Sequence, residues 1–146
     1  MIVYVDSSVL ARAYLSDERG HAQATATLDD PELALITGTW TRVEVSGALV
    51  RAARAGRGDE EGLLALLDAD LALDGAVTVV AAAQAEVEAQ ALQLVRAHGI
   101  RAMDAWHLAT ALLAAPSLVE PDEEVGFATR DEAQSRVAAA MGLLAV

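Results

Sequence analysis

Short apolar runs alternate along the chain with longer stretches in which apolar residues recur every three or four positions. The first run, residues 2–5, contains only β-branched and aromatic residues, and polar Asp6, Ser7 and Ser8 follow it. A short apolar run with polar ends is typical of a strand buried on both faces, as in the middle of a parallel sheet. We therefore expect Asp6 at the carboxyl end of a buried strand, the edge at which open α/β sheets bind ligands. The competing interpretation is that Asp6 only caps a helix.

The same pattern predicts four more strands and seven helices. The strands are expected at residues 33–36, 77–80, 125–129 and 143–146, and the helices at 9–15, 21–28, 40–55, 59–72, 83–98, 104–114 and 131–141. Strands that alternate with helices predict a parallel sheet with helices on both faces, a three-layer α/β fold. The 146 residues suffice for one compact domain, residues 1–146, and are too few for two.

Local signals refine these boundaries. Ser7 or Ser8 can cap the helix at 9–15, and Thr39 or Thr41 the helix at 40–55, with a turn at residues 37–39. Four leucines of the helix at 59–72 form an apolar stripe, at positions 63, 66, 67 and 71. Residues 119–124 are expected to form an acidic loop.

Composition narrows the possible functions. Apolar residues make up 54% of the chain and charged residues 22%, as in a globular protein. No apolar run approaches the roughly 20 residues of a membrane span, and no basic segment precedes the first run, so we expect a cytoplasmic protein without a membrane partner. The chain has no cysteine, which excludes disulfides, thiolate nucleophiles and cysteine-bound metals.

The charged residues exclude further functions. The net charge of −12 argues against a broad basic surface for nucleic acid. All ten basic residues are arginine, so neither a phosphate-binding loop with its lysine nor Schiff-base chemistry is available.

Four acidic residues occupy the ends of predicted elements. Asp6 and Asp131 follow strands, and Glu44 and Asp104 lie in the first turns of helices. If the strands are parallel, all four project from one edge of the sheet, where they suit a hard divalent cation such as Mg²⁺ or Mn²⁺. Taken singly, each acid is also explained as a favourable charge at a helix N-terminus. Crowding of the four should raise the pKa of at least one.

Four stretches resemble the signatures of a known family: Asp-Ser-Ser-Val-Leu at 6–10, Arg-Val-Glu-Val-Ser-Gly-Ala-Leu at 42–49, Met-Asp-Ala-Trp-His-Leu-Ala-Thr-Ala at 103–111 and Ala-Thr-Arg-Asp at 128–131. In this order and spacing they resemble the PIN-domain nucleases, in particular the VapC toxins of bacterial toxin–antitoxin pairs. The resemblance covers nearly the whole chain, and all four acidic positions are filled. It therefore implies an active enzyme with a three-layer PIN-like fold.

The resemblance implies a magnesium-dependent endoribonuclease. Asp6, Glu44, Asp104 and Asp131 would be the catalytic residues and would bind one or two Mg²⁺ ions, for which Mn²⁺ can substitute. Ser8 and Thr129 would support these ligands. The metal would activate a water molecule for attack on a phosphodiester, leaving a 5′-phosphate and a 3′-hydroxyl.

The implied partners are an RNA substrate, plausibly transfer or ribosomal RNA, a cognate antitoxin protein that covers the acidic pocket, and a second copy in a homodimer. The sequence leaves open which RNA is cut, how many metal ions bind and how the toxin assembles with its antitoxin.

Other polar residues carry weaker signals. Arg42 and Arg51 are possible RNA contacts, although arginines near a helix end are equally well explained as solvated. His107 lies three residues after Asp104 and is expected to be a core or supporting histidine. A serine–histidine–aspartate hydrolase is disfavoured because the chain lacks a GxSxG elbow.

Three alternative functions use similar acidic residues. A phosphoacceptor signalling module normally pairs its aspartate with a lysine, which is absent here. An aspartate-nucleophile phosphatase usually has a second aspartate where this chain has Ser8. A catalytically silent module with an acidic metal pocket stays open, and metal-dependent RNA cleavage would distinguish it from the nuclease.

Overall fold

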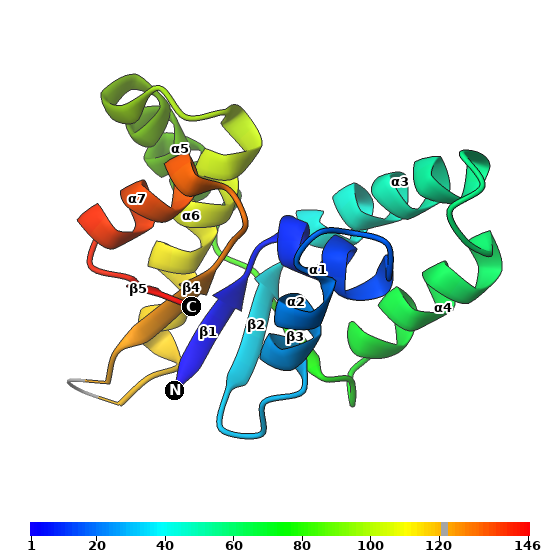
Figure 1. Cartoon of the computed structure of the whole chain (residues 1–146). Helices are drawn as coiled ribbons and strands as arrows, with labels where there is room; N and C mark the ends of the chain where they lie inside the picture. The colour runs from blue at the N-terminus through cyan, green and yellow to red at the C-terminus, as the bar shows by residue number, and fades with distance from the viewer. Residues whose placement is uncertain (121–122) are drawn as a thin grey trace.

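The computed structural model describes residues 1–120 and 123–146 as a parallel sheet between two layers of helices (Figure 1). The strands are β1 (Ile2–Val5), β2 (Ala34–Gly38), β3 (Val77–Val80), β4 (Val125–Ala128) and β5 (Leu144–Ala145). Their order is β3-β2-β1-β4-β5, and every neighbouring pair is parallel. The predicted three-layer α/β fold is confirmed. Pro121 and Asp122 of the predicted acidic loop lie outside the described residues.

Each predicted helix is present with small shifts at its ends. The helices are α1 (Ser7–Tyr14), α2 (His21–Leu28), α3 (Trp40–Arg54), α4 (Glu60–Asp70), α5 (Gln84–His98), α6 (Ala102–Ala114) and α7 (Glu132–Ala140), with a short 3₁₀ turn at Ala115–Ser117. Within residues 1–120 and 123–146, none of the helices has the length and apolar character that crossing a membrane requires.

The central strand β1 separates two hydrophobic cores. Because successive side chains of a strand point to opposite faces, Val3 and Val5 enter the core under α1–α4, whereas Tyr4 enters the core under α5–α7. All three side chains are buried. In the second core the rings of Tyr4 and Phe127 stack with centroids 5.4 Å apart. Burial on both faces explains the continuous apolar run that begins the sequence.

Several local predictions were wrong. Asp6, not Ser7 or Ser8, caps α1, and its carboxylate accepts a hydrogen bond from the Ser8 backbone N–H at 3.2 Å. Thr39 occupies the N-cap position of α3, as one of the two predicted alternatives, but its side chain makes no capping hydrogen bond. The Thr41 hydroxyl lies 2.7 Å from that of Thr37 inside the protein. The predicted turn at 37–39 is largely strand, since residues 37 and 38 pair with β3.

The leucine stripe of α4 is narrower than predicted. Leu63, Leu67 and Leu71, spaced by four, are buried, whereas 51% of Leu66 is exposed. Three leucines are enough to cover this end of the core, so Leu66 is left on the solvent side of the helix.

Gly126 of β4 provides a test of the packing between strands. A Cβ at this position would lie 2.9 Å from Cγ2 of buried Val3 and 2.8 Å from Cγ2 of Val146. We expect Gly126→Ala to destabilise the protein by about 1–3 kcal/mol, because the neighbouring strand must move. The control is Gly47→Ala in α3, where only the flexible end of Arg51 is close; it should stabilise by up to about 1 kcal/mol through helix propensity. Urea unfolding measures the free energy of unfolding of both variants. Equal values for Gly126→Ala and the wild type would contradict the described packing.

Candidate active site

Four carboxylates meet at the carboxyl edge of the sheet. Asp6 ends β1, and Asp131 follows the neighbouring strand β4 and caps α7. Glu44 comes from α3, which begins after β2, and Asp104 from the first turn of α6. All four line one pocket of ≈ 400 Å³, here called the carboxylate pocket, together with Ser8, Arg101, Ala102 and Met103. The structure therefore brings together the four acids that the sequence singled out.

Asp6 is the most buried of the four, with 5% of its surface exposed. Its Oδ2 lies 3.2 Å from the Ser8 backbone nitrogen and 3.2 Å from the Thr129 hydroxyl. Its Oδ1 is 3.6 Å from Nε2 of His107. Asp6 thus caps α1 and also lines the pocket. The helix-cap and ligand-site interpretations of this residue are therefore compatible.

Glu44 is held by side chains from two other elements. Its Oε2 accepts a hydrogen bond from the Ser7 hydroxyl at 2.8 Å and contacts Nε2 of His107. Burial alone would raise the pKa of Glu44. The hydrogen bonds from His107 and Ser7, with the nearby positive charges, outweigh burial and hold that pKa below its usual value.

His107 connects this carboxylate to the core. Its Nδ1 is 2.9 Å from the Tyr4 hydroxyl, which also accepts a hydrogen bond from the Gly38 backbone at 3.0 Å. Burial lowers the pKa of His107, but the carboxylates of Glu44, Asp6 and Asp104 outweigh it and raise the pKa above its usual value.

The surroundings of His107 differ from those of a hydrolase triad. Ser7 Oγ lies 3.2 Å from Nε2, but the second ring nitrogen faces the Tyr4 phenol. A triad needs a carboxylate at that nitrogen.

Asp104 and Asp131 share one arginine. The Arg101 guanidinium donates to Oδ2 of Asp104 from Nε and to Oδ2 of Asp131 from Nη2, both at 2.8 Å. Burial is the main cause that raises the pKa of Asp104, and the charges of Asp131 and Asp6 add to it, while Arg101 opposes them. One carboxylate pKa is raised, as predicted, but the main cause is burial of Asp104 and not the crowding on which the prediction rested. Arg101, whose side chain is 75% exposed, supplies the nearest positive charge.

The residues predicted to support the ligands lie beside Asp6. The Thr129 hydroxyl is 2.6 Å from Oε1 of Gln134 and accepts a hydrogen bond from the Asp131 backbone N–H at 3.1 Å. Having one hydrogen, it donates either to Gln134 or to Asp6. Ser8 Oγ accepts a hydrogen bond from the Arg130 backbone N–H at 3.0 Å.

Sequence reasoning missed several residues of this network. Gln134 is fully buried, and its amide donates to the Asp104 carbonyl at 3.2 Å, which joins α7 to α6. Tyr4 and Arg101 were not singled out either, and Ser7 was not expected to contact Glu44. Only their proximity in sequence to Asp6, Asp104 and Asp131 could have indicated them.

The donor set suits a hard divalent cation, with four carboxylates and neither cysteine nor lysine. As the side chains lie, however, no three of the described histidine, aspartate and glutamate residues converge closely enough to hold an ion. Glu44 is turned toward Ser7 and His107, and Arg101 spans Asp104 and Asp131. Binding of a cation would therefore require these side chains to exchange partners.

The two arginines predicted to contact RNA differ in position. Arg51 lines a separate pocket of ≈ 400 Å³ with Arg12 and Arg57, here called the arginine pocket, which shares Ser8 with the carboxylate pocket. Arg42 instead binds Asp68 at 2.7 Å and the Leu71 carbonyl at 3.1 Å, away from either pocket wall.

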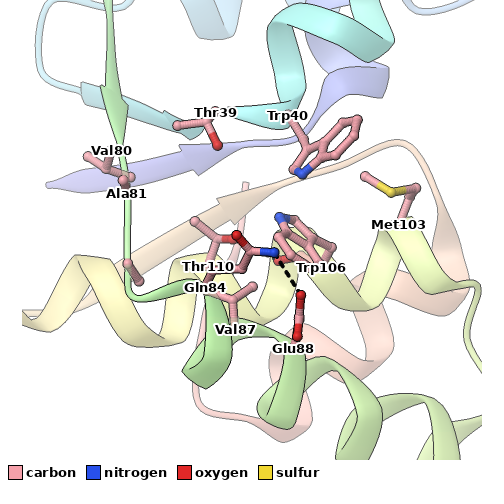
Figure 2. A pocket seen from close by; sticks show the side chains of 11 residues that line it. Thr39, Trp40, Val80, Ala81, Gln84, Val87, Glu88, Met103, Trp106 and Thr110 are labelled. Atoms are coloured by element: carbon pink, nitrogen blue, oxygen red, sulfur yellow. Dashed lines mark hydrogen bonds between the residues drawn. The ribbon is translucent and has the colours of Figure 1, made fainter.

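A larger pocket of ≈ 500 Å³ adjoins the site on its other side (Figure 2). Trp40 and Trp106 face each other edge to face across it, with ring centroids 6.5 Å apart. Met103 lines both this pocket and the carboxylate pocket.

Comparisons with known proteins agree with this architecture. A family model described as PIN domain matches residues 3–140. The structure is similar to that of PAE2754 from Pyrobaculum aerophilum, with a TM-score of 0.62 and 20% identity over 100% of this chain and 84% of that one. It is also similar to VapBC-1 from nontypeable Haemophilus influenzae, with a TM-score of 0.57 and 15% identity over 100% and 97% of the two chains. No curated protein sequence matches the chain.

The raised pKa of His107 predicts a pH dependence of stability. A histidine whose pKa is raised by folding stabilises the native state fully below its unfolded pKa of about 6.5, and this contribution is lost as pH rises through the folded value. In chelator, the free energy of unfolding of the wild type should therefore fall as pH rises above about 6.5. His107→Gln should show a shallower fall, and exposed His98→Gln should follow the wild type. Urea unfolding across this pH range measures the slopes; parallel slopes for His107→Gln and the wild type would contradict the assignment.

Proposed function

The chain belongs to the PIN-domain family, and from this premise we propose that it is a magnesium-dependent endoribonuclease and the toxin of a type II toxin–antitoxin pair. PIN domains are generally nucleases that use divalent metal ions. The observation that carries the proposal is the meeting of Asp6, Glu44, Asp104 and Asp131 in one pocket at the carboxyl edge of the sheet. RNA as the substrate rests on the resemblance to the VapC toxins.

In this proposal the four carboxylates hold one or two Mg²⁺ ions, or Mn²⁺ in their place. When bound, the ion lowers the pKa of a water molecule and offsets negative charge on the phosphodiester. Asp6 is the fixed ligand, because the Ser8 backbone and the Thr129 hydroxyl orient its carboxylate. Asp104 and Asp131 would have to give up their ion pairs with the exposed Arg101 side chain in order to hold the ion.

Glu44 has a second task besides metal binding, which follows from the two partners of its carboxylate. Ser7 and His107 hold it at the pocket wall, and the Tyr4 hydroxyl fixes the His107 ring from behind. A carboxylate placed in this way can orient the attacking water or accept its proton. His107 is a positioning residue in this arrangement, since it acts through Glu44.

The proposed partners follow from the same family resemblance. A cognate antitoxin would cover the carboxylate pocket, and a homodimer would be the toxin's assembly state in the cytoplasm. VapBC-1, whose fold this chain shares, supports the comparison with VapC toxins. The net charge of −12 would speed capture of a basic antitoxin segment and make it sensitive to salt.

Cleavage assays test the enzyme. We expect the purified protein to cut RNA with Mg²⁺ or Mn²⁺ and to lose this activity in chelator. Asp6→Asn and Asp104→Asn should each lower the rate by orders of magnitude, because each removes an anionic ligand. The matched control, Asp74→Asn, replaces an exposed acid outside the carboxylate pocket and should keep the wild-type rate. RNA that stays intact with either metal would instead favour a catalytically silent module.

Growth experiments test the toxin assignment. Expression of the wild type should arrest growth, whereas Asp104→Asn should not, because the arrest depends on RNA cleavage. Co-expression of the short reading frame that neighbours the gene should relieve the arrest by supplying the antitoxin. Sequencing of RNA ends shortly after induction identifies the RNA that is cut. Normal growth of cells that contain soluble, active enzyme would contradict the toxin assignment but not the nuclease.

A further inference from the structure

Arg130, between β4 and α7, has an unusual environment for a charged side chain. Its Nε and Nη2 atoms are buried, and among the described residues neither has a hydrogen-bond partner. The guanidinium of arginine stays protonated in proteins, so these are buried donors on a cation. A donor left in this way costs free energy unless a partner supplies the missing hydrogen bonds.

A second arginine lies close enough to Arg130 to repel it. Burial is the main cause that lowers the pKa of Arg130, and repulsion by Arg12 adds to it. The two are brought together through Ser8, because Ser8 and Arg12 are four residues apart on α1 and share a face of that helix. The Ser8 hydroxyl binds the Arg130 backbone N–H at 3.0 Å.

Other arginines near the site are neutralised within the chain. Arg57 binds Asp17 and Glu18, and Arg101 binds Asp104 and Asp131. Across residues 1–120 and 123–146, neither Arg12 nor Arg130 takes part in an ion pair. Arg19, Arg51, Arg96 and Arg136 also lack an ion pair among the described residues, but Arg12 and Arg130 differ from them because Ser8 brings the two close to each other.

We propose that Arg12 and Arg130 form a binding site for a backbone phosphate of the RNA substrate, next to the phosphate that is cleaved. Guanidinium groups match the geometry of phosphate oxygens and bind them with charge-assisted hydrogen bonds. To bind the anion, the Arg130 guanidinium would have to turn out of its buried position, where Nε and Nη2 have no partner, and the anion would then satisfy these donors and remove the repulsion with Arg12. This assignment rests on the proposed function, which supplies the RNA.

The position of the two arginines relative to the carboxylate pocket favours RNA over a free anion. Arg12 lines the arginine pocket, which shares Ser8 with the carboxylate pocket. Arg130 lines a pocket that shares Asp131 with it. Exposed Arg51 and Arg136 lie on the same two walls. An RNA strand that leaves the carboxylate pocket at Ser8 or Asp131 would therefore meet positive charge on an otherwise acidic protein.

Thermal melts with inorganic phosphate test the anion site without RNA or metal. In chelator, and at matched ionic strength against chloride, phosphate should raise the melting temperature of the wild type more than that of Arg12→Ala or Arg130→Ala. Arg96→Ala, an exposed arginine on α5, removes the same charge and should respond like the wild type. This control corrects for the general stabilising effect of phosphate. An equal shift in all four proteins would overturn the site.

The same melts provide a check on folding. Without phosphate, Arg130→Ala should be at least as stable as the wild type, since it removes buried donors that lack partners. If this variant does not fold, Arg12→Ala, which changes a partly exposed side chain, carries the test alone.

RNA binding tests the identity of the ligand. Fluorescence anisotropy with a labelled oligouridylate, in an Asp104→Asn background with Mg²⁺, should show about tenfold weaker binding after either arginine is replaced. The slope of log affinity against log salt should decrease by about 0.7, as expected for one lost phosphate contact to a single strand. Arg96→Ala should change neither quantity. Unchanged RNA affinity alongside a lost phosphate response would overturn the RNA assignment and leave an anion site. If the wild type does not cleave RNA, the proposed function is contradicted. The anion site is tested separately, by the melts with phosphate.

Discussion

Repulsion between like charges at one edge of the sheet is the constraint on which the rest of the site depends. Because β1 and β4 are parallel neighbours, Asp6 and Asp131 leave the sheet side by side, and α3 and α6 add Glu44 and Asp104. Like charges that line one pocket repel one another, and the repulsion grows as they approach. Each carboxylate is therefore met by donors. Asp6 has the Ser8 backbone, Glu44 has Ser7 and His107, and the other two share Arg101.

These donors are not equivalent, and the difference bears on the proposed catalysis. The contacts to Asp6 and Glu44 come from buried or half-buried groups tied into the core through Tyr4 and Thr129. The contact to Asp104 and Asp131 comes from a long side chain that is largely exposed to solvent. Asp104 and Asp131 could therefore exchange their partner for a metal ion by rotation of Arg101 alone, whereas Glu44 would have to leave contacts that are tied into the core.

The distribution of arginine is compatible with the proposed RNA substrate, although the chain as a whole is acidic. A net charge of −12 would repel RNA if the charges were spread evenly. Instead, the carboxylate pocket and the pockets that share Ser8 or Asp131 with it are lined by Arg12, Arg51, Arg101 and Arg130, among others. Positive charge is thus concentrated around the carboxylate pocket, where the backbone phosphates of a bound RNA would lie. The rest of the acidic surface stays available for a basic partner protein.

The sequence by itself determined the order of the elements, the parallel sheet and the edge at which the four acids gather. These features follow from local periodicity and from the rule that parallel strands end on the same side, so Asp6, Glu44, Asp104 and Asp131 could be chosen before any contact was known. Only the tertiary structure decided which donors face these acids. Tyr4 and His107 are 103 residues apart, and Ser8 and Arg130 are 122 apart. No local pattern records such pairings, because they depend on how α6 and α7 pack against the far side of β1. The partnerless guanidinium of Arg130 likewise arises from that packing and has no counterpart in the sequence.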